Sequence, residues 1–270
     1  MIDRNVWYRN PEVIFNIIMC AKDREIALLS KKEDVMPVRN IMAQYSSFLV
    51  KNLEAFKFFQ REYNIYYSLA TYKKIEMFSF SPSTRKAQRL AWNENAIANT
   101  KAFDFGLDFD ADGLDNIKDA WNDCKKVKEL LDEYRVPYSV RFSGSKGFHL
   151  TIPSYQLPEL KITDDIRDEL SLFNWLKNLA VMLDLKLGIP TLDMGIFDPR
   201  RIWKASYSYV CESGLICLPL TDEQFNHFNL SMVEPVNVLK LGIRNRGDLV
   251  REGADDGLKR LVTESLDGKY

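Results

Sequence analysis

Apolar and polar positions follow regular patterns most clearly between residues 103 and 153. Phe103–Asp110, Tyr138–Ser143 and Gly147–Pro153 each carry the alternation of a strand. Between the first two strands, apolar residues recur at the three- and four-residue spacing of an amphipathic helix, which Asp112 or Asp115 can cap. The apolar face of this predicted helix consists of Ile117, Ala120, Trp121, Cys124, Val127 and Leu131.

Strand, helix and strand in this order form a βαβ unit. We therefore expect its two strands to run parallel, with a right-handed crossover. The third strand then returns as an antiparallel hairpin partner of the second. A sheet with both orientations favours an α/β or α+β architecture over a pure doubly wound fold. We class the fold as α+β (mixed α/β), with a mixed sheet flanked by helices.

The N-terminal part of the chain, residues 1–62, is predicted to be mostly helical. Arg24–Ser30 is the exception, because it is apolar enough to form a short strand. Residues 38–63 carry apolar positions at helical spacing and predict a helix. Asn64–Tyr72 is aromatic and β-branched, which predicts a strand at the start of a core region, residues 63–220.

Helices and short strands are also predicted further along the chain. Ile166–Leu187 has the spacing of a long amphipathic helix, and Gly188–Pro190 is its stop signal. Two or three short strands are expected within residues 191–220, and helices over residues 221–270. No internal repeat interrupts this order, so we expect residues 1–270 to form a single domain.

The composition is that of an ordinary globular protein. Of the 270 residues, 46% are apolar and 28% are charged, and the formal net charge is −1. Nucleic-acid-binding domains are usually basic, so the charge alone does not indicate one. A local basic groove is still compatible with it, because acidic active-site residues lower the total.

The four cysteines form neither a zinc-ribbon pattern nor a disulfide framework, which makes a reducing cytosolic setting the default expectation. They are Cys20, Cys124, Cys211 and Cys217. The first ten residues lack the basic and apolar regions of a secretory signal. No apolar run approaches the length needed to span a bilayer, so we expect no membrane partner.

Two carboxylates on one predicted strand are the first candidate for chemistry. Side chains alternate along a strand, so Asp108 and Asp110 point to one face while Leu107 and Phe109 point to the core. Two adjacent carboxylates repel each other, and a hard divalent cation removes that repulsion by taking oxygen ligands. The alternative is a pair of solvated residues at a strand end, where Asp is common.

The hairpin stretch Phe142–Leu150, FSGSKGFHL, is the second candidate. Backbone N–H groups that point outward from its turn would form an anion-binding nest. Lys146 supplies a point charge suited to phosphate, and the hydroxyls of Ser143 and Ser145 can donate to phosphate oxygens. His149 can donate from a ring nitrogen. The alternative is a plain polar hairpin turn, and the stretch is not a Walker A loop.

A third candidate segment holds further acidic and basic residues, which are Asp193, Asp198, Arg200, Arg201 and Lys204. A third carboxylate beside the strand pair would complete a two-metal site for in-line displacement at phosphorus. The cations of this segment are suited to a triphosphate tail. Taken alone, the segment can equally be an ion-paired surface loop.

In this order the three segments resemble the motifs of the archaeo-eukaryotic primase superfamily. Its apolar-Asp-apolar-Asp strand matches Leu107–Asp110, and its Ser-Gly-x-basic-Gly-x-His hairpin matches Ser143–His149. Its third motif, an apolar residue and Asp followed by a basic residue, matches Leu192–Asp193 with Lys204. The seven-residue hairpin motif is the specific part.

The resemblance implies a role for each matched residue. Asp108, Asp110 and Asp193 would be catalytic and would bind two divalent metals, Mg²⁺ or Mn²⁺. Asp193 is preferred over Asp198 by spacing. The nucleotide would be bound by Ser143, Ser145, Lys146, His149, Lys204 and Arg39.

The implied activity is that of a primase small-subunit-like nucleotidyltransferase, which makes short primers on single-stranded DNA from nucleoside triphosphates. Implied partners are the DNA template, NTP or dNTP, and a primase large subunit or another replication protein. The implied setting is the cytoplasm, or a nucleoid-associated, viral or plasmid replication complex. Two alternatives remain: an end-joining or gap-filling repair polymerase of the same superfamily, and a non-catalytic nucleic-acid-binding subunit.

Overall fold

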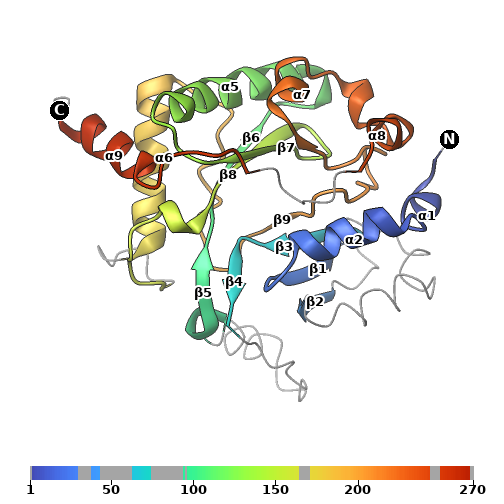
Figure 1. The fold of residues 1–270 in the computed structure, drawn as a ribbon, viewed down its shortest axis with the longest axis horizontal. Coiled ribbons are helices and arrows are strands. Elements are labelled where there is room, and N and C mark those ends of the chain that lie inside the picture. The colour runs from blue at the N-terminus through green and yellow to red at the C-terminus, as the bar shows by residue number, and fades with distance from the viewer. Residues whose placement is uncertain are drawn as a thin grey trace. The chain divides into compact units, whose positions relative to one another are not determined.

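The computed structural model describes residues 2–29, 38–42, 63–73, 94, 96–163, 171–243 and 250–267. The chain divides into two compact units, and each consists of three segments. The first unit comprises Met1–Phe103, Pro199–Cys217 and Asn229–Gly247. The second unit comprises Asp104–Asp198, Leu218–Phe228 and Asp248–Tyr270. Figure 1 shows the helices and strands of both.

The second unit is built on a four-stranded sheet in the order β10-β7-β8-β6. Its strands are β6 (Phe105–Asp110), β7 (Ser139–Phe142), β8 (Gly147–Ile152) and β10 (Pro219–Leu220). Both β6 and β7 pair antiparallel with β8, so they run in the same direction, as the sequence predicts. They are not neighbours, because the returning hairpin strand β8 lies between them. The mixed α+β class is confirmed.

Helix α5 (Ile117–Glu133) covers one face of this sheet by packing on β6 and β8 (Figure 1). The predicted apolar positions of the two strands form the core on that side, and Phe109 and Phe148 are fully buried. The predicted cap is wrong. A short 3₁₀ turn, Leu114–Asn116, leads into α5, and neither the turn nor the helix has a side-chain cap hydrogen bond.

The other helices of the second unit are α6 (Leu172–Leu187), α7 (Asp222–Asn226), α9 (Gly257–Asp267) and the 3₁₀ turn η3 (Ser154–Gln156). The sequence predicts a long helix from Ile166. The structure shows α6 beginning at Leu172, because the preceding residue, Ser171, has an extended backbone. Residues 164–170 lie outside the described residues. The predicted stop is correct: α6 ends at Leu187, and the next residue, Gly188, has a φ of 58° that glycine readily adopts.

The first unit holds a second antiparallel sheet, in the order β2-β1-β3-β9, and a small two-stranded one. The strands are β1 (Glu25–Leu29), β2 (Val38–Met42), β3 (Asn64–Ser68), β9 (Ile202–Lys204), β4 (Ala70–Tyr72) and β5 (Thr100–Phe103). The helices are α1 (Arg4–Trp7), α2 (Pro11–Cys20), η4 (Leu230–Val233) and α8 (Pro235–Leu241).

One prediction for the first unit is wrong where the structure describes it. Val38–Met42 is a strand and not the start of a helix, because it pairs with β1, and pairing overrides a weak local preference. Residues 43–62 lie outside the described residues. The short strand within Arg24–Ser30 is confirmed as β1. Over the described ranges, no helix is both long and apolar enough to cross a membrane.

Gly147 begins β8 directly opposite Asp110 of β6. A Cβ atom added at Gly147 would lie 2.0 Å from the carbonyl oxygen of Phe109 and 2.8 Å from Oδ1 of Asp110. The first contact is with backbone, which no side-chain rotation relieves. Only glycine allows the two strands to approach this closely.

We therefore expect Gly147→Ala to destabilise the protein by about 1–3 kcal/mol, because β8 must move away from β6. Urea denaturation measures the change. Thr151→Ala, on the same strand at a half-buried position, is the matched control and should stay close to wild type. An unchanged midpoint for Gly147→Ala would show that the strands have room to separate.

Candidate active site

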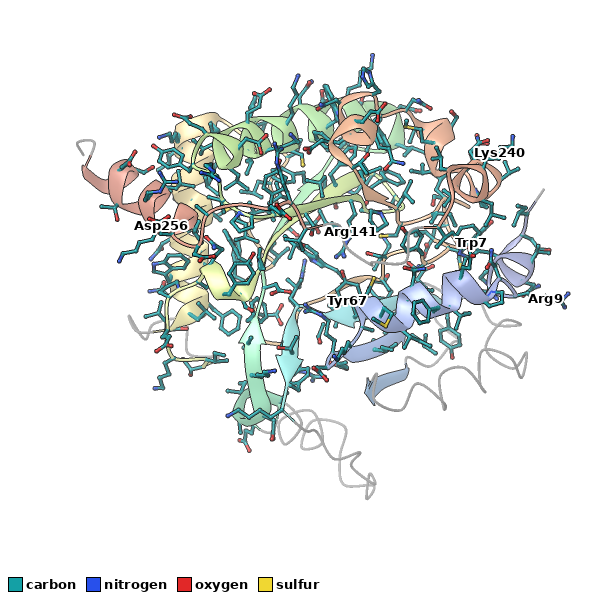
Figure 2. All side chains as sticks on the ribbon, viewed as in Figure 1. Trp7, Arg9, Tyr67, Arg141, Lys240 and Asp256 are labelled. Carbon is teal, nitrogen blue, oxygen red and sulfur yellow. The ribbon has the colours of Figure 1, made fainter. Side chains whose placement is uncertain are left out.

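A row of three side chains crosses the sheet of the second unit at one register position. Asp108 of β6 pairs with His149 of β8, and His149 pairs with Arg141 of β7 (Figure 2 labels Arg141). Nε of Arg141 donates to Nδ1 of His149 at 3.1 Å, and Nε2 of His149 lies 3.4 Å from Oδ1 of Asp108. Arg141 is 2% exposed, so the imidazole links two charged groups within the protein.

This row determines the tautomer of His149. The guanidinium of Arg141 can only donate, so Nδ1 of His149 must accept and carries no proton. In the neutral ring the proton then lies on Nε2, the nitrogen that faces Asp108. The histidine therefore presents a donor towards the carboxylate on β6.

Asp110 lies two residues along the same strand face, beside the hairpin turn. Its Oδ2 is 3.4 Å from Nζ of Lys146, and both side chains are partly exposed, at 39% and 45%. The strand register explains the contact, because Asp110 is opposite Gly147, the residue after Lys146. The carbonyl of Lys146 also accepts from the backbone N–H of Ala111. The acidic strand and the hairpin are thus joined at this end.

Asp193 lies beside the edge of β6 that faces away from β8. The backbone N–H of Asp193 donates to the carbonyl of Asp108 at 2.8 Å, and the N–H of Asp110 donates to the carbonyl of Thr191 at 2.8 Å. Leu192 forms an isolated antiparallel bridge with Phe109. In this register Asp193 is opposite Asp108. Its Oδ1 accepts from the backbone N–H of Gly195 at 2.8 Å.

The three carboxylates have the donor chemistry of a hard divalent cation site, because they offer only oxygen. Backbone register brings Asp108, Asp110 and Asp193 to one end of β6. Even so, across the part of the chain that the structure describes, no three His, Cys, Asp or Glu side chains are grouped closely enough to hold an ion. The three residues are of the right chemical type and lie in register, and their binding of a metal stays a prediction.

The turn of the hairpin differs from the expected nest. The backbone N–H of Ser143 donates to the carbonyl of Gly147, and that of Ser145 donates to Oγ of Ser143 at 3.3 Å. These two N–H groups therefore bond within the hairpin and do not point outward as expected. Lys146 and Ser145 are half-buried, whereas Ser143 is 2% exposed.

The remaining predicted residues lie elsewhere. Lys204 is on β9 and Arg39 is on β2, both in the first unit, so neither belongs to the sheet that carries the carboxylates. Asp198 is in the second unit, five residues beyond Asp193, and its N–H donates to the carbonyl of Ile196. Cys124 is fully buried, and burial raises the pKa of its thiol far above the usual value, so it is no candidate nucleophile.

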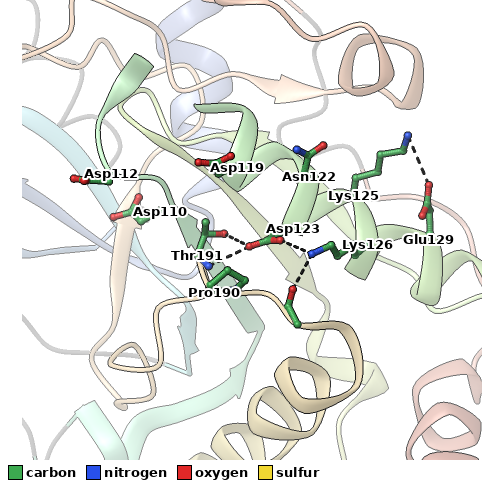
Figure 3. Close-up of a pocket in the computed structure, with 11 residues that line it drawn as sticks. Asp110, Asp112, Asp119, Asn122, Asp123, Lys125, Lys126, Glu129, Pro190 and Thr191 are labelled. Carbon is green, nitrogen blue, oxygen red and sulfur yellow. Dashed lines mark hydrogen bonds and ion pairs between the residues drawn. The ribbon is translucent and has the colours of Figure 1, made fainter. Parts of the chain in front are cut away.

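An open depression of about 800 Å³ adjoins the carboxylates (Figure 3). Asp110 and Asp112 line one end of it, the face of α5 lines its side, and the loop Gly188–Thr191 completes it. The sequence predicts no role for two residues that contact the candidate site, Arg141 and Asp123. Arg141 meets His149 across the β7–β8 hairpin, so strand register could have indicated that contact. Asp123 meets Thr191 from a distant segment, and no local pattern reveals that contact.

Known proteins were compared with the chain by sequence and by fold. No family model and no curated protein sequence matches it. Similar solved structures include the polymerase domain of Mycobacterium tuberculosis ligase D in complex with DNA, at 13% identity and a TM-score of 0.48. Others are the catalytic domain of primase Repb' in complex with initiator DNA (10%, 0.41) and the AEP domain of the cyanophage S-2L primase-polymerase (12%, 0.41).

These matches extend over most of each chain. They cover 97%, 98% and 86% of this chain, and 88%, 95% and 96% of the respective structures. All three are polymerase or primase domains.

We expect NMR to find His149 in the Nε2–H tautomer, because Arg141 donates to Nδ1. Long-range ¹⁵N–¹H correlations of the imidazole distinguish the two nitrogens directly. Arg141→Met, which removes the donor and keeps much of the side-chain volume, should allow the other tautomer to appear. A protonated Nδ1 in the wild-type neutral ring would contradict the Arg141–His149 hydrogen bond.

Proposed function

We propose that the chain is a nucleotidyltransferase of the archaeo-eukaryotic primase superfamily, which synthesises short primers on single-stranded DNA from nucleoside triphosphates. One observation supports the proposal above all. Asp108 and Asp110 share one face of β6, and His149 and Lys146 of the hairpin lie at 3.4 Å from them. Carboxylates can bind divalent metal ions, and the neighbouring lysine and histidine can bind phosphate. This combination suits the transfer of a nucleotidyl group to a hydroxyl oxygen.

Asp108, Asp110 and Asp193 would hold Mg²⁺ or Mn²⁺. When bound there, such ions lower the pKa of an attacking 3′-hydroxyl and neutralise charge that develops on the phosphate. Backbone hydrogen bonds between β6 and the Thr191–Asp193 segment hold Asp193 in register opposite Asp108.

Lys146 and His149 would bind the phosphates. The Lys146–Asp110 pair is partly exposed and contributes at most about 1 kcal/mol, so Lys146 can turn towards an anionic ligand at little cost. His149 is held more rigidly, because Arg141 fixes one ring nitrogen and the other is aimed along the carboxylate row. Ser143 and Ser145 would add further nucleotide contacts. The DNA template and a large subunit or other replication protein would be the partners.

Asp110→Asn tests the catalytic role of the carboxylates. Asp110 is partly exposed, so the variant should fold, whereas Asp108 is more deeply buried beside His149. We expect nucleotide incorporation on a primed template with Mn²⁺ to fall by about 100-fold or more, as loss of a charge-stabilising group does.

Asp119→Asn is the control for that experiment. Asp119 is exposed on α5 and lines the same depression, but it is not on β6. The substitution removes the same charge as Asp110→Asn. It should keep the wild-type rate. Full activity in Asp110→Asn would rule out the assignment of the site.

Initiation without a primer separates the proposed activity from repair synthesis. On single-stranded DNA with NTPs or dNTPs and Mn²⁺, we expect the wild-type chain to produce short primers. The reason is that primer synthesis must bind an initiating nucleotide as well as an incoming one, and the hairpin offers two cationic or hydrogen-bond-donating groups, Lys146 beside Asp110 and His149 beside Asp108. Extension of primed or gapped ends alone would favour the repair-polymerase alternative.

A further inference from the structure

The loop between α6 and Asp193 has little regular structure of its own. Its contacts with β6 include one isolated bridge, Leu192 with Phe109, and two backbone hydrogen bonds. Side chains alternate between faces, so a slip of one residue would turn Asp193 away from Asp108. The register of this loop therefore needs a restraint from outside the sheet.

Asp123 of α5 supplies such a restraint. It is 4% exposed, and its Oδ2 accepts from both the backbone N–H of Thr191 at 3.1 Å and the hydroxyl of Thr191 at 2.9 Å. Figure 3 shows the carboxylate between Thr191 and Lys126. Charged acceptors make the stronger hydrogen bonds of proteins, so Thr191 is held both by its backbone and by its side chain.

Lys126 extends the same clamp to the start of the loop. Its Nζ lies 2.8 Å from Oδ1 of Asp123 and 2.7 Å from the carbonyl oxygen of Gly188. One turn of α5 thus contacts the loop at Gly188 and again at Thr191. Thr191 in turn accepts from the N–H of Asp110 through its carbonyl. The path from α5 to the carboxylate strand is continuous.

We infer that Asp123 is a positioning residue: through Thr191 it fixes the register of the Gly188–Asp193 loop and places Asp193 opposite Asp108. The functional part of this inference rests on the proposed role of Asp193 as a metal-binding carboxylate. The structural part depends only on the contacts between Asp123, Thr191 and β6.

Two variants test the inference, each measured by amide hydrogen exchange and by calorimetry with Mn²⁺. Thr191→Val removes the hydroxyl donor and keeps the side-chain shape, and Asp123→Asn removes the charge of the acceptor. Exchange of the Asp193 and Asp110 amides should accelerate by about 3- to 10-fold in Thr191→Val, and by more in Asp123→Asn. The amide of Phe142, which bonds to Leu218 away from the clamp, should keep its rate.

Mn²⁺ affinity should fall by about tenfold in both variants, as it does when a residue that orients metal ligands is changed. Thr191→Ser, which keeps the hydroxyl, should restore both the exchange rates and the affinity. Asp119→Asn removes a charge from the same helix and the same depression, and should change neither.

The two measurements separate the inference from the proposed function. If the Asp193 amide exchanges at the wild-type rate in both variants, the clamp does not set the register and the inference fails. If exchange accelerates while Mn²⁺ affinity is unchanged, Asp123 does not position a metal ligand and the inference also fails. A wild-type chain that binds no Mn²⁺ contradicts the proposed metal site, and the exchange rates still decide whether the clamp sets the register.

Discussion

The close approach of β8 to β6 is the constraint on which the candidate site depends. Gly147 lies against the backbone of Phe109, where no side chain fits, and this contact sets Asp110 beside the hairpin turn. The same register puts His149 beside Asp108 two residues further along. Every proposed contact between the acidic strand and the phosphate-binding hairpin follows from this one pairing.

The pairing also brings charge into the protein interior. Burial of an ion costs several kcal/mol, so a buried arginine needs polar partners. His149 is such a partner for Arg141, and it faces Asp108 with its other nitrogen. His149 is itself only 5% exposed, so the residue proposed to bind phosphate is also part of the packed structure. Function and stability are therefore coupled at His149.

Local patterns predicted the strands and faces of the second unit well. Alternation alone placed Asp108 and Asp110 on one face of β6, and the hairpin and the direction of β7 follow from the order of elements. Contacts set by register between distant segments could not be predicted, such as Asp123 with Thr191. Val38–Met42 was mispredicted because helical spacing carries no information about a partner strand such as β1. The roles assigned to Arg39 and Lys204 stay predictions.

The position of bound Mn²⁺ tests the central claim most directly. Paramagnetic Mn²⁺ broadens the NMR signals of nearby amides, and the effect maps the ion onto the fold. Binding at the proposed carboxylates predicts the strongest broadening at Asp108–Asp110, Gly147 and Leu192–Asp193. Broadening centred instead on Asp119 and Glu129, the exposed acidic side of the depression, would contradict the claim that the carboxylates of β6 and Asp193 form the metal site.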